Sequence, residues 1–127
     1  MSPAFRARIN AICADLPGVE VSDPWGSGHD AWKVGEKMFA CMGSVSPGVS
    51  VKCPDVETAD LLREQGVAGK APYFHASWVH LDETSPEEEL APRIAQSYAI
   101  VRKGLTKKLQ SSLPPFNPDD HAMRKEG

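Results

Sequence analysis

The sequence lacks long apolar runs and has few of the residues that mark specialised classes of protein. No stretch of about 18 apolar residues is present, so no membrane-spanning helix is expected. The three cysteines, Cys13, Cys41 and Cys53, are odd in number and widely spaced, which argues against a disulfide framework or a zinc ribbon. We therefore expect free buried thiols and no bound metal.

Aromatic residues are also scarce, at 7% of the 127 residues, whereas proline and glycine number 11 and 10. This balance predicts many turns between short elements. The hydrophobic and charged fractions, 41% and 24%, are ordinary for a globular domain. The segment that begins Met1-Ser2-Pro3 has no apolar signal-peptide region, so a cytoplasmic location is expected.

A strong excess of positive charge is missing as well. The formal net charge is -3, from 14 basic and 17 acidic residues, which excludes a globally cationic nucleic-acid binder but leaves room for a local basic surface. The charge is unevenly distributed. Residues 54–92 hold two basic and nine acidic side chains (-7), whereas residues 93–113 hold five basic and no acidic ones (+5).

Three helices are expected from caps and apolar spacing. The first begins after Ser2, which is placed as an N-cap, and the second spans about residues 55–65. The third has Ser85 and Glu88 in the capping-box pattern, and its apolar stripe predicts one long helix that ends near Ser112.

Five strands are expected between these helices. Residues 29–53 form three short apolar runs, of which the first two join through Gly35 and Glu36 in a predicted type II′ hairpin. Residues 72–74 and 77–82 supply two more extended pieces. The order α-β-β-β-α-β-β-α predicts the α+β class, with helices packed on a mostly antiparallel sheet. We expect one domain over residues 1–113 and a proline-rich polar tail over 114–127.

No motif in the sequence carries recognisable catalytic chemistry. Residues 26–31 match the letters of the dinucleotide-binding pattern G-x-G-x-x-A, but a strand pattern follows where a helix is required. No nucleophile elbow and no metal-ligand spacing is present. We therefore expect a non-enzymatic protein without a cofactor.

The strands do combine aromatic and basic residues. Such a mixture can line a groove, because lysines neutralise phosphates and aromatic faces stack on bases or hold a flat ligand. The alternative is that one tryptophan belongs to the core and the lysines form a solvated sheet face. The candidate binding residues are Lys37, Lys52, Tyr73, Trp78 and His80.

Several segments, in their order and spacing, resemble the MmcQ/YjbR family over about residues 5–110. They are Trp32 to Ala40, Val51-Lys52-Cys53-Pro54, Tyr73, Trp78-Val79, and Gln96-Ser97-Tyr98 with Val101 and Leu105. The resemblance implies a compact α+β fold similar to secretion chaperones and CyaY. It also implies a double-wing DNA-binding protein.

Among the positions that match the family, Phe39 and Tyr98 lie on apolar patterns and are expected to be structural. Lys37, Lys52 and Trp78, together with Tyr73, are expected to make contacts. One hypothesis is weak, salt-dependent DNA binding by a basic and aromatic sheet face. The other is a small-ligand or protein-binding module that uses the same face around Trp78 and Tyr73.

Overall fold

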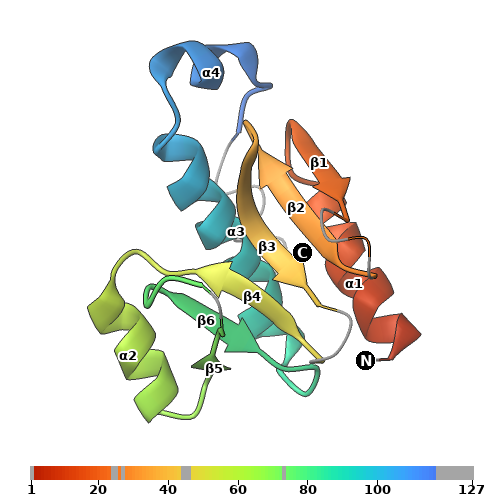
Figure 1. Cartoon of the computed structure of the whole chain (residues 1–127), viewed down its shortest axis with the longest axis vertical. Coiled ribbons are helices and arrows are strands. Elements are labelled where there is room, and N and C mark those ends of the chain that lie inside the picture. The colour runs from red at the N-terminus through yellow and green to blue at the C-terminus, as the bar shows by residue number, and fades with distance from the viewer. Residues whose placement is uncertain (1, 24–25, 27, 44–46, 73, 117–127) are drawn as a thin grey trace.

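A six-stranded antiparallel sheet and four helices make up the computed structural model, which describes residues 2–23, 26, 28–43, 47–72 and 74–116. The strands lie side by side in the order β1-β2-β3-β4-β6-β5 (Figure 1). The predicted α+β class, with helices packed on an antiparallel sheet, is confirmed. The elements are α1 (Pro3–Ala14), β1 (Val19–Ser22), β2 (Asp30–Val34), β3 (Lys37–Met42), β4 (Val49–Lys52), α2 (Val56–Glu64), β5 (Gly69–Lys70), β6 (Trp78–Leu81), α3 (Glu87–Lys103) and α4 (Lys107–Ser112).

The first two helices begin where their caps predict. The Ser2 side chain accepts a hydrogen bond from the Phe5 N–H, and the Asp55 side chain accepts one from the Thr58 N–H. Helix α1 also joins the sheet through a polar contact, since Trp32 Nε1 donates to Asn10 Oδ1 over 2.9 Å. This bond satisfies the indole N–H of a buried tryptophan.

The tight hairpin between β2 and β3 is confirmed, but its predicted type II′ turn is wrong. Gly35 and Glu36 have φ angles of 55° and 69°, and positive φ at both central residues is the type I′ pattern. The positive φ of Gly35 favours glycine, and the packing around this residue favours it as well. A Cβ at this position would lie 2.5 Å from Leu105 Cδ1, because the turn packs directly against the segment that follows α3.

Two parts of the predicted sheet differ from the structure. Strand β1 was not expected, although Val19 and Val21 alternate with polar residues and β1 pairs with β2 as an edge strand. The extended piece predicted at 72–74 is wrong for its described residues, since the Phe74 N–H closes a turn on the Ala71 carbonyl. The strand that pairs with β6 at this edge of the sheet is instead β5, which was not expected.

The single long helix predicted at the C-terminal end is two helices. Gly104 ends α3, and Thr106 begins α4 by accepting a hydrogen bond from the Leu109 N–H. The break lets Leu105 turn toward Gly35 and become buried. The predicted capping box is also wrong, because the N-cap of α3 is Pro86 and no side chain makes a capping hydrogen bond there. Ser85 lies one residue before this cap, and its N–H donates to the Asp82 carbonyl.

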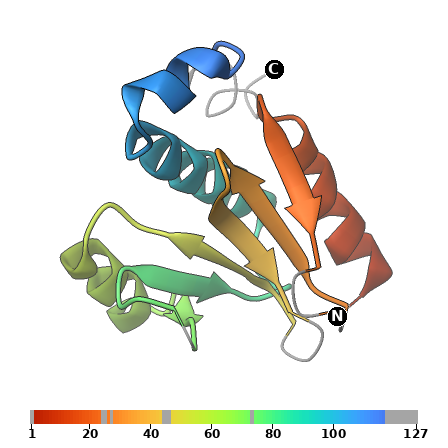
Figure 2. The same cartoon turned by 45° about the horizontal axis from the view of Figure 1, so that its top comes forward.

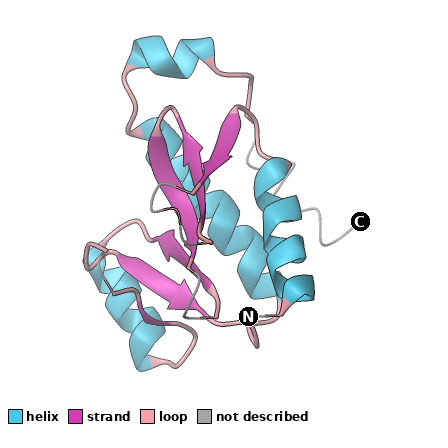
Figure 3. Cartoon of the chain, turned by 45° about the vertical axis from the view of Figure 1, so that its right-hand side comes forward, coloured by secondary structure: helices cyan, strands magenta, loops and turns pink. Residues whose placement is uncertain are grey.

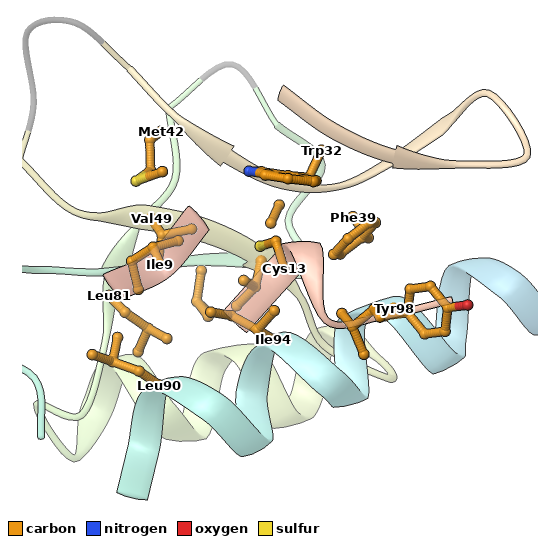
Figure 4. Packing of buried hydrophobic residues seen from close by; sticks show 14 of the residues in the cluster. Ile9, Cys13, Trp32, Phe39, Met42, Val49, Leu81, Leu90, Ile94 and Tyr98 are labelled. Carbon is orange, nitrogen blue, oxygen red and sulfur yellow. The ribbon is translucent and has the colours of Figure 1, made fainter. Parts of the chain in front are cut away.

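The core lies between the sheet and the helices α1 and α3 (Figure 4), and Ala59 and Leu62 of α2 belong to the same cluster of buried residues. Phe39 and Tyr98 are fully buried and meet edge to face, with ring centroids 5.3 Å apart. Their predicted structural role is confirmed. Burial raises the pKa of Tyr98, so its hydroxyl stays protonated and donates to the Pro17 carbonyl. Among the described residues, no helix is long and apolar enough to cross a membrane.

Ser97 of α3 bridges β3 and β4 at Phe39 and Lys52, two residues that are not paired with each other in the β3–β4 ladder. Its buried hydroxyl donates to the Phe39 carbonyl over 2.6 Å and accepts from the Lys52 N–H over 2.9 Å. A register shift between β2 and β3 near Trp32 displaces Phe39 from the regular ladder. From this point β3 and β4 diverge, which divides the sheet into two halves (Figure 3).

Candidate binding surfaces

The predicted site residues do not form one surface. Lys37 is exposed and follows the β2–β3 turn, whereas Lys52, Trp78 and His80 lie on β4 and β6. Tyr73 lies outside the described residues. The structure therefore brings three of the five candidates to one pair of strands and leaves Lys37 on the other half of the sheet.

Two of these residues are held by internal hydrogen bonds. His80 Nε2 lies 2.7 Å from the Pro47 carbonyl, and its Nδ1 lies 3.1 Å from Ser50 Oγ. Both ring nitrogens thus have partners within the protein. Lys52 Nζ lies 3.3 Å from Ser77 Oγ, so its ammonium group turns toward the segment before β6.

Four exposed lysines lie near the contact between Gly35 and Leu105 in the chain, and we call them the basic corner: Lys37 follows Gly35 by two residues, and Lys103, Lys107 and Lys108 lie within three residues of Leu105. The contact between Gly35 and Leu105 brings the β2–β3 turn beside the α3–α4 connection, and both lie at the same end of the molecule in Figure 1. Among the described residues, none of these four lysines has an ion-pair partner. Glu36 is the acidic residue in the turn itself.

The backbone of the basic corner is fixed although its lysines are exposed. Gln110 Nε2 donates to the Lys103 and Leu105 carbonyls over 3.2 and 2.8 Å, which ties α4 back to the end of α3. Arg102 is used internally, because it donates to Tyr98 Oη and to the Pro114 carbonyl. The corner can therefore present its lysines from a defined surface.

A second feature is a shallow pocket of about 150 Å³ beside Trp78, which we call the Trp78 pocket. Its lining residues belong to α2, β5, β6 and the segment between these two strands, and Figure 2 shows these elements on the half of the sheet away from α4. Phe74 stacks on Trp78 with ring centroids 4.5 Å apart and planes inclined by 20°. The pocket is lined by Arg63, Lys70, Ala71, Phe74, His75, Ala76 and Trp78.

Of the residues predicted from the sequence, only Trp78 lines this pocket within the described chain, and the sequence reasoning missed Arg63, Lys70, Phe74 and His75. One signal was available. Arg63 and Lys70 are the two basic residues of the otherwise acidic segment 54–92, and the fold brings both to the pocket. Two basic residues in an otherwise acidic segment are therefore the sequence feature that indicates this pocket.

The described residues contain no group of three or more His, Cys, Asp or Glu side chains placed to hold a metal ion. The three cysteines are free and buried, as expected. Burial raises the pKa of the Cys41 thiol to about 11, and the nearby Asp30 carboxylate adds to this shift. Burial likewise raises the pKa of Cys13 and Cys53, so all three favour the protonated thiol.

Comparison with known proteins identifies the family. The family model named YjbR matches residues 14–100. The chain belongs to the YjbR family. This chain is also similar to a solved structure, the crystal structure of Deinococcus radiodurans protein DR2400, which is described as the family-model domain DUF419. The TM-score is 0.73 and the identity 23%, over 84% of this chain and 86% of that one. No curated protein matches the chain.

Proposed function

We propose that this YjbR-family domain is a non-enzymatic, cytoplasmic DNA-binding protein that binds DNA weakly through the basic corner. The observation that carries the proposal is the contact between Gly35 and Leu105, which brings the turn before Lys37 beside the α3–α4 region that holds the other three lysines. Four exposed cations on one corner can each neutralise a phosphate. The family resemblance, with its double-wing DNA-binding expectation, supports the same function.

This arrangement also accounts for DNA binding by an acidic protein. The net charge of -3 opposes binding at long range, but salt screens charges that lie more than about 10 Å apart at moderate ionic strength. The local field of the basic corner then dominates close to the DNA. Phosphate contacts of this kind carry no base sequence information, so low sequence preference is expected.

The proposal is tested by fluorescence anisotropy with short duplex and single-stranded DNA at low salt. Four phosphate contacts predict that the logarithm of the duplex binding constant falls with the logarithm of salt concentration, with a slope between about -3 and -4. Lys103→Glu/Lys107→Glu should lower the affinity at least tenfold, on the order of the effect of losing or reversing charged contacts.

Lys52→Glu is the matched control, because Lys52 is also a strand lysine but turns toward Ser77 and lies outside the basic corner. It should change the affinity much less than the double variant. If no DNA binding occurs at high protein concentration, or if both variants bind like the parent protein, the proposed function is wrong. The alternative of a small-ligand or protein-binding module around Trp78 and Tyr73 would use the other half of the sheet.

A further inference from the structure

The Trp78 pocket combines positive charge with a flat aromatic wall, and it lies apart from the basic corner. Arg63 comes from α2 and Lys70 from β5, so the fold gathers the two cations of segment 54–92 around one recess. Both basic side chains of this segment therefore line the same recess, although they come from different elements. We infer that the pocket binds a small planar anion, of the aromatic carboxylate class, against the stacked Phe74 and Trp78 rings.

The Arg63 guanidinium is positioned before any ligand arrives. Its Nη1 donates to the Trp78 carbonyl over 3.3 Å and to the Ala76 carbonyl over 3.5 Å. It also forms an ion pair with Asp60 on the same helix, which offsets part of its charge. A group held in this way loses little conformational freedom when an anion binds.

Lys70 supplies the charge that is not compensated. Its side chain is exposed, and among the described residues it has no hydrogen-bond or ion-pair partner. A carboxylate in the pocket would give this ammonium group a partner. Lys70 is therefore the residue whose removal should weaken binding without disturbing the fold.

His75 adds a hydrogen-bond donor. The Ser77 N–H donates to His75 Nδ1 over 3.1 Å, which assigns the proton of the neutral ring to Nε2. Ser77 Oγ lies 2.9 Å from the same Nδ1 and accepts a hydrogen bond from Lys52 Nζ over 3.3 Å. Lys52 is therefore connected to the His75 ring through the Ser77 hydroxyl. The exposed His75 can then offer its Nε2–H to an oxygen in the pocket.

The size of the recess limits the ligand. Drug-sized ligands occupy pockets of roughly 300 to 1,000 Å³. A recess of about 150 Å³ fits a single ring that bears one acidic group and is too small for a dinucleotide. Because the recess is shallow and the ligand small, we expect a dissociation constant on the order of 1 mM.

The test is a titration of the full chain with benzoate, followed by the indole Nε1–H signal of Trp78 in 1H–15N spectra; Trp78→Phe assigns that signal. Benzoate should shift it in a saturable manner, whereas neutral benzamide should not. Lys70→Gln should weaken benzoate binding about fivefold, the upper end of the effect of losing one solvent-exposed ion pair. Lys108→Gln, at the basic corner, should leave it unchanged.

Three outcomes would overturn the inference. The first is that benzoate leaves the Trp78 signal in place. The second is that inorganic phosphate binds at the same site as tightly as benzoate, which removes the role of the aromatic wall. The third is that Lys70→Gln and Lys108→Gln weaken benzoate binding equally, which would indicate a general effect of protein charge. DNA binding measured on the same samples tests the basic corner separately.

Discussion

The basic corner and the Trp78 pocket both gather positive charge, but they hold it differently. At the corner the lysines are exposed at the start of β3, the end of α3 and the start of α4, without ion-pair partners in the described chain. In the pocket one cation, Arg63, is fixed by backbone carbonyls beside an aromatic stack. Exposed, adaptable cations suit a polyanion, whereas a fixed cation beside a flat wall suits one small anion.

The two halves of the sheet that carry these surfaces are joined by Ser97. Ser97→Ala should have the largest effect on stability, because it leaves the Phe39 carbonyl and the Lys52 N–H without their buried partner. Two such groups cost about 3 kcal/mol together. The free energy of unfolding, measured by urea denaturation, should fall by that amount.

Ser111→Ala is the control for this change, since Ser111 is exposed and its hydroxyl bonds only to the nearby Lys108 carbonyl in the described chain. Its cost should stay within about 0.5 kcal/mol. Equal losses from the two serine variants would mean that Ser97 does not couple the halves.

The geometry of the basic corner depends on the contact between Gly35 and Leu105. Gly35→Ala should cost about 2 kcal/mol, because it combines a positive φ with a Cβ only 2.5 Å from Leu105 Cδ1. Gly66→Ala has a similar φ of 74° but open space around its Cβ. Because the two φ angles are similar, the difference between the losses of unfolding free energy in Gly35→Ala and Gly66→Ala measures the cost of the close approach to Leu105. Equal losses in the two variants would contradict that contact.

The separation of the two surfaces is tested by crossing their variants. Lys103→Glu/Lys107→Glu should reduce DNA affinity at least tenfold, equivalent to about 1.4 kcal/mol, and leave benzoate affinity unchanged. Lys70→Gln should weaken benzoate binding about fivefold and leave the DNA affinity unchanged. Parallel losses of both activities in both variants would show that the corner and the pocket act as one site.

The smallest expected effect concerns the Cys41 thiol on β3. Its pKa is raised to about 11 in the folded protein, so folding favours the protonated form. This stabilisation is complete below the unfolded thiol pKa near 9 and is lost as pH rises from there to about 11. Between pH 8 and 10, Cys41 should contribute about 1 kcal/mol to the fall in unfolding free energy, in addition to the contributions of Cys13 and Cys53, and Cys41→Ala should remove that part. An unchanged loss would assign it to other groups.

The sequence predicts elements whose signals are local. Ser2 and Asp55 cap the helices they precede, and Gly35 marks the hairpin, because capping and turn formation involve residues only a few positions apart. The long helix was predicted past its true end at Lys103 because Leu105 continues the apolar spacing. Its actual contact, with the β2–β3 turn, exists only in the folded chain.

The candidate sites were predictable to a smaller extent. Trp78, a binding candidate from the sequence, lines the pocket, and its binding role stays a prediction. The placement of Lys37 apart from Lys52 follows from the divergence of β3 and β4 at Ser97. No spacing rule connects Arg63 on α2 with Lys70 on β5, so their meeting depends on the pairing of β5 with β6. Whether any of these residues binds a ligand stays a prediction.

The hydrogen bond between Trp32 and Asn10 gives the molecule a built-in optical reporter. The Trp32 indole is buried between the sheet and α1, so its emission should move to longer wavelength when that helix detaches. The Trp78 indole reports on the opposite half of the sheet. The third tryptophan of the chain, Trp25, lies outside the described residues. With Trp25 and Trp78 both replaced by phenylalanine, Trp32 would be the single tryptophan, and its emission would follow helix detachment in an unlabelled protein.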